Sequence, residues 1–115
     1  MSRPIATSDN GWLSSLLPHF LKQTKERLFE IKGHQLAIND EIDVFAAMKA
    51  ICDVAHKISG TADLFGFYYL GEFARDVESD FVKELELFDN PKISWSRVEP
   101  SLTLLIQEIE RSLNS

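Results

Sequence analysis

The sequence predicts an all-α fold, an up-down-up-down four-helix bundle forming a single domain. Apolar residues recur near the 3.6-residue period of a helix in four successive segments. Short connectors separate these segments, and no stretch alternates apolar and polar residues as a half-buried strand would. We divide the chain into a flexible N-terminal tail, residues 1–8, and one helical-bundle domain, residues 9–115.

The first predicted helix follows the polar tail, and Asp9 or Asn10 is expected to cap it. Pro18 should kink this helix or mark its first turns, because proline lacks the backbone N–H that a helix interior uses. We expect Gly33 just past the end of the helix and residues 34–39 as a connector. The apolar stripe consists of Leu13, Leu17, Phe20, Leu21, Leu28 and Ile31.

The second predicted helix begins after Asn39 or Asp40, either of which can cap it, and Glu41 and Asp43 suit its positive N-terminus. The helix is expected to end or bend between residues 60 and 66, where two glycines lie. Its apolar stripe follows the three-four alternation of a bundle seam. The stripe consists of Val44, Met48, Ile51, Ala55, Ile58, Ala62 and Phe65.

The third predicted helix covers roughly residues 64–87, and Gly71 within it would let another helix come close. Residues 89–91, Asp-Asn-Pro, predict a turn, because proline disfavours helix at the residue before it. Two apolar stripes follow the helical period in this half of the chain. They consist of Leu70, Phe73, Val77, Phe81, Leu85 and Phe88, and of Val98, Leu102, Leu105, Ile109 and Leu113.

The fourth predicted helix begins near Ser94 or Ser96, since Ser96 and Glu99 fit a capping box. This start would place Pro100 in or near the first turn, where proline is tolerated.

Composition excludes several classes of function. A net charge of -6 argues against a nucleic-acid surface and against an anionic membrane surface. The single cysteine, Cys52, allows no disulfide within the chain and favours a reducing compartment. The start lacks the apolar run of a signal peptide, and no apolar run is long enough to span a membrane. We therefore expect a cytoplasmic protein, and a piece of a larger protein is compatible with this sequence.

The most informative residue is His56, whose imidazole is a good nucleophile at neutral pH. Gly60 lies four residues later and hence on the same helix face. Glycine costs about 1 kcal/mol against alanine inside a helix, so its presence needs a reason. Here it removes the side chain that would lie beside the imidazole. We expect His56 at the edge of the buried face, open to another molecule.

Glu78 is the predicted partner of His56. The second and third helices should be antiparallel neighbours, and both residues lie just beside their apolar stripes, so they can meet across the seam. A carboxylate that accepts the Nδ1 proton would fix the tautomer, leave Nε2 free to attack and stabilise a positive ring. The alternative is a solvated surface glutamate.

These residues resemble the phosphoacceptor motif of histidine phosphotransfer (Hpt) domains, most of all the phosphotransfer domain of CheA-type chemotaxis histidine kinases. The likeness in pattern covers nearly the whole chain, but only the segment around His56 is specific. The family usually has a lysine three residues after the histidine, where this chain has Ser59. The matching residues are Ala55, His56, Ile58, Gly60, Ala62, Phe65, Gly66, Phe67 and Glu78.

The resemblance implies that the phosphoryl group on His56 needs hydrogen-bond donors. Lys57, Ser59 and Arg75 are the candidates. Ser59 can donate one hydrogen bond but brings no charge. Lys57 is rotated by about 100° from His56 on a helix, so it is equally compatible with an ordinary solvated lysine. Arg75 lies one turn before Glu78, where it could pair with Glu78 or reach the phosphate.

The resemblance also implies a docking patch around His56, because a receiver domain must bring its aspartate to that residue. We expect the patch to be small and partly apolar, with Lys49 and Lys57 on its rim. The patch residues are Lys49, Cys52, Asp53, Gly60, Asp63, Leu64 and Phe67.

No metal site or cofactor is expected in this chain. Cys52 and His56 have a spacing that could hold two metal ligands, but no second pair matches them. His19 and His34 have no partners at meaningful spacing. The glycines form neither a Walker motif nor a dinucleotide fingerprint. ATP would belong to the kinase domain, and Mg²⁺ to the receiver.

The sequence therefore predicts a phosphotransfer domain, a relay more than an enzyme in its own right. Its partners would be a histidine kinase catalytic domain, in cis or in trans, and a CheY-like response-regulator receiver. Two alternatives stay open. One is a receiver-docking module that is never phosphorylated, for which Ser59 argues. The other is a structural helical bundle that dimerises through a leftover apolar face.

Overall fold

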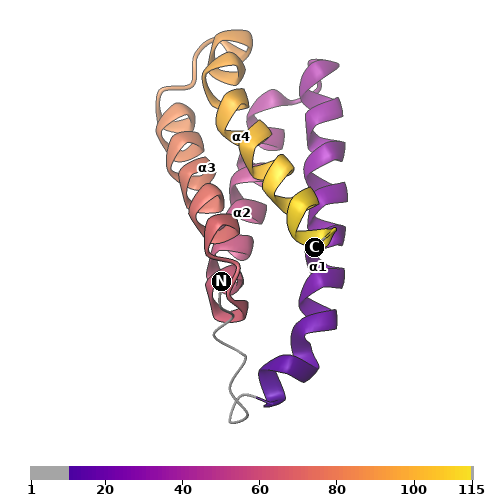
Figure 1. The fold of residues 1–115 in the computed structure, drawn as a ribbon. Coiled ribbons are helices and arrows are strands. Elements are labelled where there is room, and N and C mark those ends of the chain that lie inside the picture. The colour runs from indigo at the N-terminus through magenta and orange to yellow at the C-terminus, as the bar shows by residue number, and fades with distance from the viewer. Residues whose placement is uncertain (1–10, 115) are drawn as a thin grey trace.

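Four α-helices make up most of residues 11–114, the part of the chain that the computed structural model describes (Figure 1). The helices are α1 (Gly11–Asn39), α2 (Val44–Ala62), α3 (Tyr68–Glu86) and α4 (Pro91–Leu113), and a 3₁₀ turn, η3 (Asp63–Phe65), links α2 to α3. Residues 11–114 contain no strand, which confirms the predicted all-α bundle. The tail at residues 1–8 and the cap at Asp9 or Asn10 lie outside the described residues.

Each helix packs against the next along the chain, and α1 packs against α4, so the four helices form a closed ring. The contact between α2 and α3 is the most extensive in the ring. The lower end of α1 extends past the other three helices (Figure 1). No helix in this part of the chain is long and apolar enough to cross a membrane.

The connection between α1 and α2 differs from the prediction. Helix α1 continues through Gly33 to Asn39. Ile38, seven residues after Ile31, is buried like it, and this added core contact offsets the roughly 1 kcal/mol cost of a helical glycine. The cap of α2 is Asp43, whose carboxylate accepts the N–H of Ala46 at 3.3 Å.

Helix α4 begins earlier than predicted. Asn90 is extended and accepts the N–H of Ile93 at 3.1 Å, and Pro91 occupies the first helical position. The predicted capping box at Ser96 is wrong, because the Ser96 hydroxyl donates to the carbonyl of Ile93 inside the helix at 2.7 Å. Pro100 thus lies in the helix interior, where it has no N–H to donate to the carbonyl of Ser96. Both residues are exposed, so water can reach this carbonyl.

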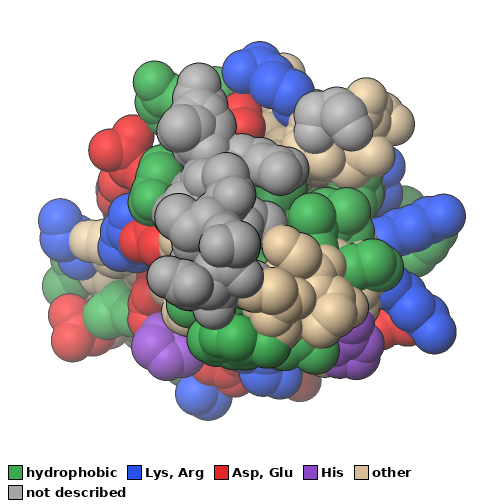
Figure 2. All heavy atoms as spheres, turned by 60° about the horizontal axis from the view of Figure 1, so that its bottom comes forward, with side chains coloured by type: hydrophobic (Ala, Val, Ile, Leu, Met, Phe, Trp, Pro, Cys, Tyr) green, Lys and Arg blue, Asp and Glu red, His purple; other side chains and the backbone are tan. Residues whose placement is uncertain are grey.

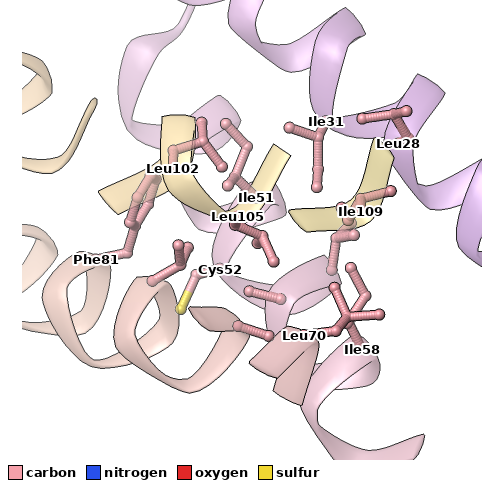
Figure 3. Packing of buried hydrophobic residues seen from close by; sticks show 14 of the residues in the cluster. Leu28, Ile31, Ile51, Cys52, Ile58, Leu70, Phe81, Leu102, Leu105 and Ile109 are labelled. Carbon is pink, nitrogen blue, oxygen red and sulfur yellow. The ribbon is translucent and has the colours of Figure 1, made fainter. Parts of the chain in front are cut away.

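The core fills the space between the four helices, and all of them contribute to it (Figure 3). At the end where α2 turns into α3, Phe20 of α1 stacks on Phe65 with ring centroids 4.6 Å apart and contacts Phe67 at 5.4 Å. Gly66 between them has φ 85°, a left-handed conformation that favours glycine. This aromatic cluster fixes the turn and so sets how α2 and α3 align. The largest fully buried side chains are Ile31, Met48, Ile51, Ile58, Leu70, Phe81, Leu102, Leu105 and Ile109.

Candidate functional site

His56 of α2 and Glu78 of α3 form a hydrogen-bonded pair on the outer face of the bundle. Nδ1 of His56 lies 2.7 Å from Oε2 of Glu78. The His56 side chain is 72% exposed, whereas that of Glu78 is 30% exposed. With Nδ1 engaged and most of the ring open to solvent, Nε2 is the ring nitrogen left for another molecule. The structure thus brings together the two residues that the sequence paired.

The position of the pair follows from the helix stripes. Ala55 and Val77, the residues just before His56 and Glu78, are both fully buried in the seam between α2 and α3. The next residue on each antiparallel helix is rotated out to the seam edge, so the two side chains face each other. Cys52, one turn before His56, is oriented to donate its thiol proton to the main-chain oxygen of Glu78, which lies 3.7 Å from Sγ. This contact supports the same alignment of α2 and α3.

A groove of about 450 Å³ extends from this pair along α2 and α3. Its lining residues are Lys49, Cys52, Asp53, His56, Glu78, Val82, Leu85 and Glu86. Three expected docking residues, Lys49, Cys52 and Asp53, line this groove, although Cys52 is buried. On the α3 side of the groove, sequence reasoning found Glu78 but did not assign Val82, Leu85 and Glu86 to the site. Val82, four residues after Glu78, and Leu85, seven after it, share its helix face and could have been found by that spacing.

Gly60 leaves open space beside the site. It is exposed, and a Cβ added there would have nothing within 4 Å. Ser59 does not use its hydroxyl toward the groove, because it donates to the main-chain oxygen of His56 at 2.9 Å. Gly60 is thus open to solvent, whereas Ser59 is engaged within its own helix.

Lys57 lies on a different side of α2. It lines a small hollow with four residues of α1, namely Gln23, Glu26, Arg27 and Glu30. The rotation of about 100° per residue carries Lys57 toward α1 while His56 faces α3. The structure does not bring Lys57 together with His56 and Glu78.

Arg75 pairs with Asp63, with Nη1 and Oδ2 3.0 Å apart, and not with Glu78. On α3 it lies one turn before Glu78, and the two side chains line one shallow groove together with Ser79. Asp63, expected as a docking residue, is the partner of Arg75. This pair could not be predicted from the sequence, because it depends on the 3₁₀ turn at Asp63.

The end of the bundle next to the site is partly apolar. Figure 2 views the molecule from the end where α2 turns into α3, and hydrophobic side chains are exposed there among charged ones and histidines. Leu64 is 50% exposed, as expected for a docking residue, but Phe67 is half-buried against Phe20. Tyr68 and Tyr69, which sequence reasoning did not single out, are 53% and 71% exposed.

The electrostatics of Cys52 make it a poor nucleophile. Burial raises the pKa of the Cys52 thiol above its ordinary value, and the negative charges of Glu78 and Asp53 raise it further, against a smaller opposing effect of Lys49. The thiol is therefore protonated at neutral pH. Residues 11–114 contain no group of three His, Cys, Asp or Glu side chains that could hold a metal ion.

Comparison of the chain with protein-family models, with curated proteins and with solved structures finds no match in any of the three.

The raised pKa of Cys52 predicts slow alkylation. In the folded protein, the midpoint of the iodoacetamide rate against pH should lie above that of the unfolded chain, because the thiolate forms only at higher pH. Glu78→Gln removes one negative charge and should lower the midpoint, whereas Glu86→Gln, which lines the same groove but does not perturb the thiol, should leave it unchanged. A folded midpoint at or below the unfolded one would contradict this electrostatic account.

Proposed function

We propose that this chain is a histidine phosphotransfer domain of a two-component signalling kinase of the chemotaxis type. His56 accepts a phosphoryl group from an ATP-dependent kinase domain and passes it to an aspartate of a response-regulator receiver. The observation that carries the proposal is the 2.7 Å contact between Nδ1 of His56 and Glu78 on an imidazole that is otherwise exposed. The motif around His56 supplies the second support.

The hydrogen bond selects the reactive nitrogen. When the neutral ring carries its proton on Nδ1, it donates that proton to the Glu78 carboxylate, and the Nε2 lone pair is free. In the first transfer a bond forms between Nε2 and the γ-phosphorus of ATP, the bond from that phosphorus to the bridging oxygen breaks, and ADP leaves. The ring becomes positive as the new bond forms, and the carboxylate of Glu78 offsets this charge.

In the second transfer an aspartate oxygen of the receiver attacks the same phosphorus. The bond between Nε2 and phosphorus breaks, and His56 returns to its neutral form. The receiver supplies the Mg²⁺ and the acidic pocket of this step, and the kinase domain supplies the ATP site. This chain contributes a positioned nucleophile, an orienting carboxylate and a docking face, so it acts as a relay. We assign the relay to the cytoplasm, with which the single buried thiol of Cys52 agrees.

The docking face in this proposal is the groove along α2 and α3 together with the open surface at Gly60 and Leu64. Val82 and Leu85 give the groove an apolar wall, and Lys49, Asp53 and Glu86 place charges around it. Apolar contacts would carry affinity, while the charges would tune the rate of encounter. A relay needs only weak, transient binding, for which a small interface suffices.

A second candidate function is a receiver-docking module that is never phosphorylated. The hydrogen bond from the Ser59 hydroxyl to the main chain favours it, because this residue stands where the family has a lysine and offers the phosphoryl group nothing. Phosphorylation of His56 separates the two functions. A purely structural bundle would show neither phosphorylation nor receiver binding.

The assignment predicts that His56→Gln abolishes phosphorylation. Incubation with a CheA-type kinase and ATP should give an acid-labile label on the wild-type chain and none on His56→Gln, since Gln has no nucleophilic nitrogen. His19→Gln, a substitution at an exposed histidine of α1, is the matched control and should be labelled fully. Helical circular dichroism should be the same in all three, because His56 is exposed. Full labelling of His56→Gln would refute the assignment.

The open space at Gly60 predicts a second outcome. Gly60→Gln should slow both the kinase step and transfer to the receiver, on the order of 10²-fold, because its side chain would obstruct approach to the imidazole. The matched control is Gly33→Gln, a substitution at another exposed helical glycine with open space around it, on α1. Transfer at the wild-type rate by Gly60→Gln would show that partners do not approach over this position.

A further inference from the structure

Asp63 occupies an unfavourable place for a carboxylate. It is the C-cap residue of α2, where the helix carbonyls concentrate partial negative charge. The guanidinium of Arg75 offsets this charge from α3, at 3.0 Å from Oδ2 of Asp63. Oδ1 of Asp63 is buried and has no hydrogen-bond partner within residues 11–114. Within residues 11–114, the side-chain oxygens of Asp63 therefore accept one hydrogen bond, the one from Arg75.

Gly71 makes room for this arrangement. A Cβ added at Gly71 would overlap Oδ1 of Asp63 and would lie 3.3 Å from Nη1 of Arg75. The absent side chain lets the Asp63 carboxylate lie directly against the backbone of α3, beside Arg75. The sequence predicts that Gly71 permits a close helix approach, and the group that approaches is this carboxylate.

The Asp63–Arg75 pair joins the end of α2 to α3, as the His56–Glu78 pair joins the same two helices nearer their middle. Arg75 precedes Glu78 by one turn, lines a shallow groove with it, and has a side chain that is 50% exposed. Asp63 follows His56 by about two turns, and Gly60 lies between them without a side chain to obstruct movement. A guanidinium has five N–H donors, so one engaged with a single carboxylate oxygen has others to offer.

The charge at His56 changes during the relay, from the positive charge of the attacking ring to the negative charge of the attached phosphoryl group. The unmodified ring must become positive as it attacks, and a guanidinium beside it would oppose that step. Once the phosphoryl group is attached, it carries a charge of about -1.5 to -2 and attracts a cation more strongly than one carboxylate does. A cation is thus unwanted before transfer and useful after it.

We infer that Asp63 holds Arg75 away from unmodified His56 and releases it to the phosphoryl group after transfer. Arg75 then supplies the charge that Ser59 lacks and that Lys57, which faces α1, does not bring to this face. Asp63 is a positioning residue in this scheme, since it acts through Arg75. The inference rests on the proposed function, because it needs a phosphoryl group on His56.

A double-mutant cycle with chemical phosphorylation tests the exchange. Phosphoramidate, which modifies histidine without a kinase, is used to label the wild type, Asp63→Asn, Arg75→Gln and the double variant. The readout is the second pKa of the phosphoryl group in ³¹P NMR titrations. Arg75→Gln should raise this pKa by roughly half a unit, the size that an exposed ion pair gives. Asp63→Asn should lower it, because it removes both a negative charge and the competitor for Arg75.

The cycle separates these two effects of Asp63. The loss of a negative charge acts in either background, whereas the release of Arg75 acts only where Arg75 is present. The shift caused by Asp63→Asn should therefore be larger with Arg75 than with Gln at that position. Asp53→Asn is the matched control, since Asp53 lies on α2 on the other side of His56, and its shift should be equal in both backgrounds. Equal shifts for Asp63→Asn, or none, would overturn the inference.

Gly71→Ala gives an independent variant that keeps every charge. Its methyl group must displace the Asp63 carboxylate, so it should lower the phosphoryl pKa in the presence of Arg75 and leave it unchanged with Arg75→Gln. A lower pKa in both backgrounds would contradict the exchange. Phosphoramidate needs no kinase, so the cycle tests the exchange of Arg75 even where a kinase fails to label His56. Failure of a kinase to label His56 would refute the proposed function alone. Failure of phosphoramidate to modify His56 in the folded wild type would overturn both.

Discussion

The hydrogen bond between His56 and Glu78 depends on one constraint, the alignment of the antiparallel helices α2 and α3. A shift of either helix by one residue would rotate one partner by about 100° and separate the two side chains. Two separate features hold the alignment. Phe20 packs against the turn that contains Gly66, and Cys52 contacts the main chain of Glu78. The chemistry of the site is thus set by packing at its borders.

The residues that stabilise the bundle are distinct from the exposed residues of the site. Its fully buried residues come from all four helices, and two of them, Ala55 and Val77, directly precede His56 and Glu78. The His56 ring can therefore remain open to solvent without removing apolar contacts from the core. Glu78 is more shielded than His56, and a hydrogen bond to a partly shielded carboxylate is stronger than one in bulk water. The bond to Glu78 thereby favours a proton on Nδ1 of the exposed imidazole.

Much of this arrangement could be predicted from the sequence, because it follows from periodicity. The four stripes predicted the bundle, and the offset of His56 and Glu78 by one residue from their stripes predicted that they meet. The open space at Gly60 followed from the same spacing. What could not be predicted depends on tertiary packing or on non-helical backbone. The burial of Ile38 outweighs the cost of a glycine at position 33, so α1 continues to Asn39. Pro100 faces solvent, so α4 continues beyond this residue. The pairing of Asp63 with Arg75 requires the 3₁₀ turn, which no stripe reveals.

The tautomer of His56 is the most direct test of this account. Two-bond ¹H–¹⁵N NMR spectra of the unmodified protein distinguish a proton on Nδ1 from one on Nε2. The hydrogen bond to Glu78 predicts that neutral His56 carries its proton on Nδ1, and that Glu78→Gln shifts the population toward the Nε2–H form that dominates in free imidazole side chains, while Glu86→Gln does not. An Nε2–H tautomer in the wild type, or the same tautomer mixture in the wild type and Glu78→Gln, would contradict the central claim that Glu78 prepares Nε2 for attack.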